Sequence, residues 1–211
     1  MSARSRRKGP KALKRTTETT PVRKTFRIYS EGKSTEPVYV DAIKRLPEFA
    51  EVISIDIVVE RMGAAPMTLV EAARDDKRKD SLDIDHYWCV FDVESPKPHP
   101  HLHRAQQMAR DNGIQLAVSN PCFELWLVLH LQDQTAHLTT DDAIRLRAKL
   151  DGARGKSLEA GRYMEHRNAA IRRAKHLRRK HLNDGTDFPH DNPSSSFGEF
   201  LSQLDAELRA R

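Results

Sequence analysis

The sequence contains few cysteines and no long apolar run. Its two cysteines, Cys89 and Cys122, lie among apolar neighbours with no C-x-x-C spacing, so buried thiols are expected rather than a disulfide or a zinc site. No apolar stretch approaches the roughly 20 residues that span a bilayer, and the basic start lacks the apolar segment of a secretory signal. These absences predict a soluble, cytoplasmic protein with no membrane partner.

Acidic residues are nearly missing from the first 24 positions. This segment has nine Lys and Arg residues against one acid, Glu18, whereas the whole chain carries a formal charge of only +6. Residues 1–24 are therefore predicted to form a basic, disordered tail. The tail either keeps the protein soluble or contacts the phosphates of a nucleic acid without sequence specificity.

Apolar segments alternate with amphipathic helices from about residue 25. Strands are predicted at 26–30, 52–60, 87–94 and 114–120, each followed by a helical pattern. The alternation predicts an α/β core over residues 25–132, with a mostly parallel four-stranded sheet flanked by helices. Only helices are predicted over residues 133–211, as a C-terminal helical lobe packed on the core, with Thr140 capping the first of them.

The run from Gly32 to Ser34 is similar to the end of a nucleotide-binding loop, but a glycine is missing. A P-loop requires G-x-x-x-x-G-K-[ST], because two glycines let the backbone wrap the phosphates. Arg27 occupies the position of the first glycine. A nucleotide cradle is therefore not expected here.

Acidic residues instead occur where predicted strands end. Glu31 follows the first strand, and Asp92 and Glu94 end the third, at alternate positions that share one side of a strand. The carboxyl ends of parallel strands lie along one edge, where such carboxylates would repel one another unless a divalent cation lay among them. Oxygen ligands favour Mg²⁺ or Mn²⁺ over zinc. The alternative is that each acid only caps a helix or lies in a loop.

Four segments in order along the chain resemble the RloB-like family. They are EGKSTE (31–36), FDVE (91–94), SNPCFELWLVLH (119–130) and NPSSS (192–196). That family is related to the Toprim-like domains of OLD-type nucleases, and the resemblance covers nearly everything after the basic tail. It implies a Toprim-like fold in which Glu31, Asp92 and Glu94 are catalytic and bind metal, with Glu36 as a further ligand. Glu94 stands where the pattern usually has an aspartate.

The resemblance implies a divalent-metal-dependent nuclease that hydrolyses the phosphodiesters of DNA or of RNA, tRNA included. Such a protein would act in bacterial anti-phage defence, with a separate ATPase subunit as its partner. The alternative is a non-catalytic Toprim-like subunit that binds nucleic acid or a partner protein, which Glu94 in place of aspartate favours slightly. The sequence does not indicate the oligomeric state.

Four residues near the predicted edge are candidates for a supporting or substrate-binding role. Lys33 either neutralises charge on the transferring phosphate or is an exposed loop lysine. Ser119, Asn120 and Glu124 follow the fourth strand, although an acid within an apolar helix could equally pair with a buried base.

A group of histidines and a group of arginines are each either functional or part of the solvated surface. Three histidines, His99, His101 and His103, follow the acidic pair, as metal ligands or as part of a proline-rich loop. Four arginines, Arg172, Arg173, Arg178 and Arg179, lie in a basic helix that either contacts nucleic acid or is solvated.

Overall fold

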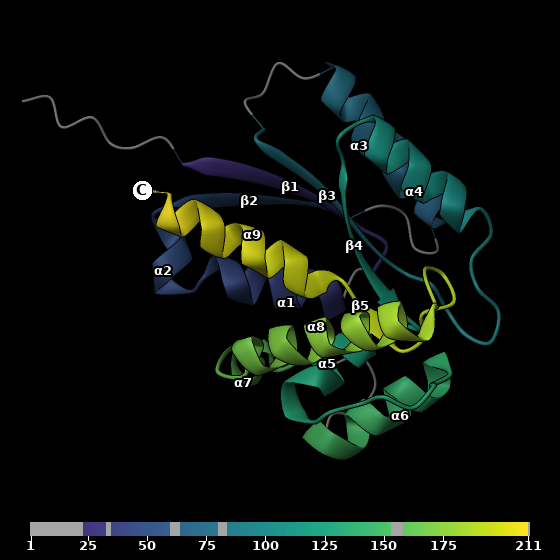
Figure 1. Ribbon diagram of the computed structural model, residues 1–211. Coiled ribbons are helices and arrows are strands. Elements are labelled where there is room, and N and C mark those ends of the chain that lie inside the picture. The colour runs from purple at the N-terminus through teal and green to yellow at the C-terminus, as the bar shows by residue number, and fades with distance from the viewer. Residues whose placement is uncertain (1–22, 33–34, 60–63, 80–83, 153–157, 211) are drawn as a thin grey trace, which may run out of the picture.

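The computed structural model describes residues 23–32, 35–59, 64–79, 84–152 and 158–210. Its strands form one sheet in the order β2-β1-β3-β4-β5 (Figure 1). The strands are β1 (Lys24–Ser30), β2 (Ile53–Val59), β3 (His86–Asp92), β4 (Gln115–Asn120) and β5 (Ser194–Ser195). The first four pair in parallel and β5 is antiparallel to β4, so the predicted α/β class is confirmed.

The predicted number of four strands is wrong. The fifth strand comes from the segment that was expected to hold only helices, and it pairs Ser194 with Asn120 and Ser195 with Ser119. Two polar residues are too short a run to show the alternation of a strand in sequence. The C-terminal segment therefore completes one edge of the sheet.

Nine helices surround the sheet within the described ranges. They are α1 (Thr35–Lys44), α2 (Pro47–Ala50), α3 (Pro66–Lys79), α4 (Leu102–Asp111), α5 (Phe123–Leu131), α6 (Thr140–Asp151), α7 (Ala160–Met164), α8 (Arg167–Asp184) and α9 (Phe197–Arg209). In Figure 1, α3 and α4 cover one face of the sheet, whereas α1 and α9 lie on the other. None of these helices combines the length and the apolar character that crossing a bilayer requires.

Strand β3 is buried on both faces, as its continuously apolar sequence predicts. Tyr87, Cys89 and Phe91 belong to the core under α3 and α4, and Trp88 and Val90 belong to the core on the opposite face. This central position fixes the end of β3 rigidly in the middle of the sheet.

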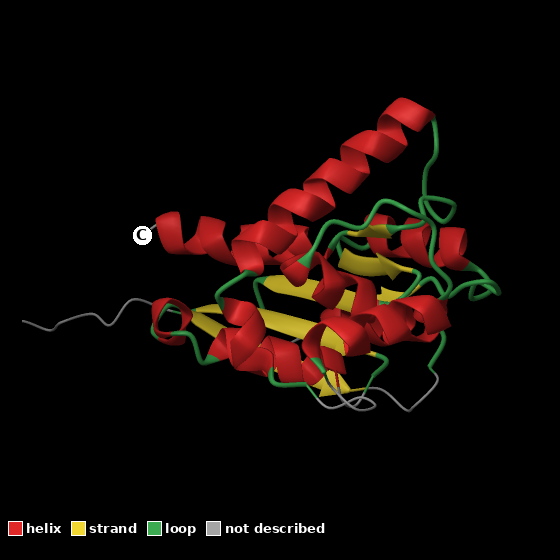
Figure 2. Cartoon of the chain, turned by 90° about the horizontal axis from the view of Figure 1, so that it is seen from below, coloured by secondary structure: helices red, strands yellow, loops and turns green. Residues whose placement is uncertain are grey.

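Helix α5 is apolar on all sides because other elements surround it. It packs against α6 and α8, which lie beyond the sheet (Figure 2). Leu125, Trp126 and Leu129 are fully buried, as is typical of a helix without a polar face. Both cysteines are buried free thiols, also as expected.

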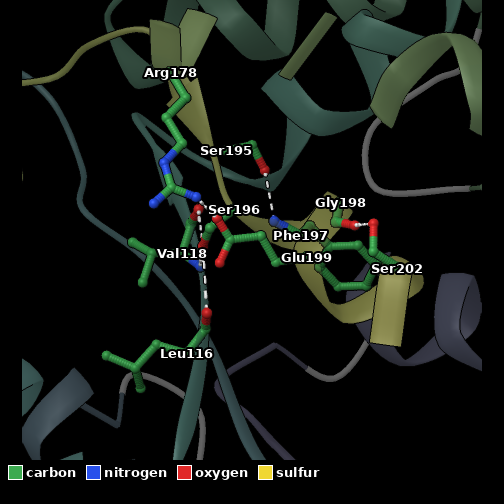
Figure 3. Close-up of polar contacts among 9 residues, drawn as sticks. All are labelled: Leu116, Val118, Arg178, Ser195, Ser196, Phe197, Gly198, Glu199 and Ser202. Atoms are coloured by element: carbon green, nitrogen blue, oxygen red, sulfur yellow. Dashed lines mark hydrogen bonds and ion pairs between the residues drawn. The ribbon is translucent and has the colours of Figure 1, made fainter. Parts of the chain in front are cut away.

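Ser196, at the turn into α9, forms hydrogen bonds to the backbone of β4 (Figure 3). The Ser196 hydroxyl accepts from the Val118 N–H at 2.8 Å and donates to the Leu116 carbonyl at 3.3 Å. The Ser196 N–H donates to the Val118 carbonyl at 2.9 Å. These bonds satisfy backbone groups that an edge strand would otherwise expose.

Candidate functional site

Five acidic residues lie at the carboxyl edge of the sheet, each with a partly buried side chain. They are Glu31 directly after β1, Glu36 in the first turn of α1, Asp92 at the end of β3, Glu94 two residues later, and Glu124 in the first turn of α5. Strands β1 and β3 are paired neighbours, so one edge collects acids that are far apart in the sequence.

Asp92 has the most perturbed environment of the five. Burial raises the pKa of its carboxyl well above the ordinary value, and the charges of Glu36, Glu124 and Glu94 raise it further. The backbone N–H of Phe123, at the start of α5, donates to Asp92 and opposes this shift. Three carboxylates are therefore close enough to Asp92 to disfavour its ionised form.

Glu36 approaches the backbone of Gly32 closely. A Cβ atom placed on Gly32 would clash with Oε2 of Glu36. Because the clashing atom ends a flexible side chain, a larger residue at position 32 would displace the Glu36 carboxylate rather than unfold the chain. The glycine of the EG pair thus makes room for the second acid.

Glu94 reaches the edge by a different route from the one that strand alternation predicts. Strand β3 ends at Asp92, and Glu94 takes a left-handed backbone conformation with φ of 71°. Its Oε2 accepts a hydrogen bond from the Thr140 hydroxyl at 2.6 Å, and that hydroxyl accepts from the Ser95 N–H at 3.1 Å.

The predicted cap of α6 is consequently wrong. Thr139 is the N-cap, because its side chain accepts from the Asp142 N–H in a reciprocal capping box. Thr140, the first residue of the helix, instead orients Glu94. Two adjacent threonines cannot be told apart as caps from sequence, because both residues have the same capping chemistry.

His99 is the histidine that the fold brings to the acidic edge. Its Nε2 atom is 3.8 Å from Oε2 of Glu31, and its backbone N–H donates to the Val93 carbonyl at 2.9 Å. His101 and His103 are exposed. The three predicted candidates therefore separate into one that faces the acids and two that face solvent.

Ser119 and Asn120 bind the C-terminal segment. The Ser119 hydroxyl is hydrogen-bonded to the Ser195 hydroxyl at 3.1 Å, and the Asn120 side-chain amide donates to the Pro189 carbonyl and to Asp191. Both side chains are buried. Lys33 lies outside the described residues.

The four predicted nucleic-acid arginines divide between structure and surface. Arg173 donates to the Leu129 and His130 carbonyls at 2.8 and 2.9 Å, and Arg178 pairs with Glu199. Arg172, Arg178 and Arg179 are exposed on α8, so the pair between Arg178 and Glu199 lies at the surface. Arg178 also lines a groove of about 530 Å³ between α8, α9 and the edge of β4, which the five acids do not line.

A family model described as RloB-like protein matches residues 26–204, which is most of the chain. The chain belongs to the RloB-like family. No curated protein and no solved structure matches it. This membership agrees with the resemblance seen in the sequence. The matched residues contain all four motifs, at 31–36, 91–94, 119–130 and 192–196.

The acids of this RloB-like chain fit a hard divalent cation by the chemistry of their donors. They offer carboxylate oxygens, the ligands that Mg²⁺ and Mn²⁺ take. Within the part of the chain that the structure describes, no three Asp, Glu, His or Cys side chains converge on one point with metal-binding geometry. Metal binding would therefore require side-chain rotations about backbone positions that are already adjacent.

Sequence reasoning missed two residues of this edge. Thr140 was expected only to cap a helix, and Cys122 only to be buried. Cys122 is the N-cap residue of α5, and burial and the charges of Asp92 and Glu124 raise the pKa of its thiol. No sequence signal could have identified the bond from Thr140 to Glu94, because it joins residues 46 positions apart.

Proposed function

We propose that this RloB-like protein is a divalent-metal-dependent nuclease that hydrolyses the phosphodiesters of DNA or RNA. The observation that carries the proposal is the placement of Asp92 against Glu36, Glu94 and Glu124 at the carboxyl edge of a parallel sheet. Like charges held together in a partly buried site are costly unless a cation compensates them. The resemblance to Toprim-like domains of OLD-type nucleases supports the same assignment.

The five acids divide the work by their positions. Asp92, on the rigid central strand, would anchor the cation, with Glu94 and Glu36 approaching from the loop and from α1. A bound Mg²⁺ or Mn²⁺ would polarise the phosphodiester and lower the pKa of a water molecule. Glu31, at the margin of the cluster beside His99, would help to hold the cation and would accept the proton that this water loses as it attacks phosphorus. The bond from phosphorus to the leaving oxygen breaks, and that oxygen takes up a proton from solvent.

The N-termini of α1 and α5 help to hold the anionic groups. Glu36 and Glu124 lie in first turns, where unpaired backbone N–H groups and the helix dipole favour negative charge. Each such placement is worth roughly 0.3–1 kcal/mol. This stabilisation does not neutralise the carboxylates. Their mutual repulsion therefore remains, and a bound cation would relieve it.

The biological setting follows the resemblance rather than the site. We propose a role as effector in anti-phage defence, in which a separate ATPase subunit would control the nuclease. The acidic edge supports the proposed chemistry, whereas the support for the defence role is family resemblance alone.

A second candidate is a non-catalytic subunit that binds nucleic acid or a partner protein. The lack of a converged set of three metal donors in the described ranges favours it. Arg172, Arg178 and Arg179 are exposed on α8 and are available to the proposed nucleic-acid track, whereas Arg173 is bound to the end of α5.

Calorimetric titration of the full chain with Mn²⁺ and Mg²⁺ tests the proposal, together with cleavage of plasmid DNA and of total tRNA. Asp92→Asn keeps the shape of the side chain and removes its charge, so it should abolish cleavage and weaken metal binding at least about 100-fold. Asp111→Asn, an exposed aspartate on α4, should behave as the wild type. Wild-type protein that binds neither metal would leave the second candidate.

A further inference from the structure

His99 has a buried polar atom without a hydrogen bond. Its Nε2 lacks a hydrogen-bond partner among the described residues, as do polar atoms of Tyr87, Trp88 and Trp126. The other three belong to aromatic side chains of the two apolar cores. His99 differs because its orphaned nitrogen is 3.8 Å from a carboxylate oxygen of Glu31, at the edge where acids collect.

A buried polar atom without a partner calls for a physical explanation. Leaving such an atom unsatisfied costs roughly 1–3 kcal/mol, and nothing in the backbone forces His99 to accept this cost. Its side chain is 22% exposed, so rotation toward solvent is open to it. The side chain nevertheless faces the acidic edge, in a loop whose main chain is held by the bond from the His99 N–H to the Val93 carbonyl.

The separation of the two side chains is close to that of two ligands on one cation. Ligands bound at about 2.1 Å to an octahedral ion lie about 3 Å apart when adjacent and about 4 Å apart when opposite. The observed 3.8 Å between Nε2 and Oε2 falls within this span. A direct hydrogen bond would instead need about 3 Å.

We infer that His99 is a nitrogen ligand of the divalent cation, which it shares with Glu31. The inference rests on the proposed function, because it assumes a cation at the acidic edge, and it adds a ligand of a different chemical class. An imidazole nitrogen favours Mn²⁺ over Mg²⁺, since Mg²⁺ takes oxygen ligands almost exclusively. The site is therefore selective for Mn²⁺.

Two matched variants separate His99 from the rest of its loop. His99→Asn removes the imidazole and keeps a polar side chain. His101→Asn is the control, because His101 is exposed and its φ of 62° suits asparagine, which tolerates the left-handed region. Both variants leave all five acids unchanged.

Pulsed electron paramagnetic resonance on the Mn²⁺-loaded full chain gives a readout that is independent of cleavage. Wild-type protein and His101→Asn should show the hyperfine coupling of a directly bound ¹⁴N, which ¹⁵N-histidine labelling replaces by the ¹⁵N coupling. His99→Asn should lose this coupling. Its affinity for Mn²⁺ should fall at least about tenfold, whereas its affinity for Mg²⁺ should stay close to that of the wild type.

The possible failures are distinguishable. Mn²⁺ bound by the wild type without nitrogen coupling, or with coupling that survives in His99→Asn, would overturn the role of His99 and leave the proposed function intact. Wild-type protein that binds no Mn²⁺ at all would overturn both.

Discussion

The two ends of helix α5 contain charged and polar groups arranged in opposite ways. At its C-terminal end, His130 bonds to the Tyr39 hydroxyl and to the Trp126 carbonyl, both at 2.8 Å, and Arg173 binds the last carbonyls. At its N-terminal end, Glu124 lies against Asp92 and raises its pKa. The first end satisfies its polar groups and stabilises the fold. The second assembles like charges, which do not stabilise the fold and which the proposed cation would compensate.

The largest expected effect on stability comes from His130, at the satisfied end. Burial lowers its pKa from 6.5 to about 4, and the charge of Arg173 contributes in the same direction. The unfolded chain therefore takes up a proton before the folded protein does. Stability should be complete above pH 6.5 and should fall by about 3 kcal/mol as the pH drops to 4.

Urea unfolding at pH 7, 6, 5 and 4 measures this slope. His130→Gln should flatten it, although the variant starts from a lower stability at pH 7. His176→Gln replaces an exposed histidine of α8 and should retain the wild-type slope. Equal slopes in all three proteins would contradict the lowered pKa of His130 and the account of its buried hydrogen bonds at the C-terminal end of α5.

Removal of the Arg173 side chain should have the next largest effect on the free energy of unfolding. Its guanidinium donates to the carbonyls of Leu129 and His130 and pairs with Asp133. Arg173→Ala is expected to lower the free energy of unfolding by about 2 kcal/mol, whereas Arg179→Ala, an exposed change on the same helix, should stay within about 0.5 kcal/mol. Chemical denaturation of both variants tests whether the basic helix serves structure at one position and surface at the other.

Neutralising an acid at the N-terminal end of α5 should stabilise the protein, in contrast to the two changes above. The raised pKa of Asp92 means that its ionised form is disfavoured in the folded protein. Asp92→Asn should therefore raise the free energy of unfolding of the metal-free protein at pH 7. The gain should shrink as the pH falls toward the ordinary carboxyl value of 3.8, because the wild-type carboxyl is then protonated too.

Denaturant unfolding in the presence of a chelator measures this gain. Asp111→Asn, at an exposed position, should show no comparable gain. A loss of stability in Asp92→Asn would mean that the bond from the Phe123 N–H outweighs the repulsion, and the contrast between the two ends of α5 would disappear.

The smallest effect concerns the threonine that orients Glu94. Thr140→Val keeps the shape of the side chain but removes the bond to Oε2 of Glu94. It should cost up to about 1 kcal/mol of stability and weaken Mn²⁺ binding a few-fold. Thr139→Val removes the N-cap of α6 at a similar cost but should leave Mn²⁺ affinity unchanged. Calorimetric titrations that show equal affinities for the two variants would exclude an orienting role for Thr140.

The sequence was sufficient for the parts of the fold that depend on local pattern. Four parallel strands and the buried helix 123–131 follow from apolar runs and their breaks, and Asp92 follows from its place at a strand end. The strand Ser194–Ser195 could not be predicted, because two serines carry no periodic signal. The position of Glu94 depends on a left-handed residue and on a contact with Thr140, neither of which leaves a local trace.

The same limit applied to the charged residues. Density of arginine in α8 suggested a binding surface, yet Arg173 is engaged because α5 happens to end beside it. Three closely spaced histidines gave no reason to prefer His99, which differs from the other two by its partial burial and by the approach of Glu31 from the end of β1. Long-range packing decides which of several similar side chains meets a partner, and spacing along the chain does not encode it.

Anomalous diffraction at the manganese edge, on crystals grown or soaked with Mn²⁺, tests the central claim most directly. A cation site at the acidic edge predicts an anomalous peak about 2.2 Å from a carboxylate oxygen of Asp92, in contact with at least two more of the five acids or with His99. Full-occupancy manganese elsewhere on the protein, with no peak at Asp92, would contradict it.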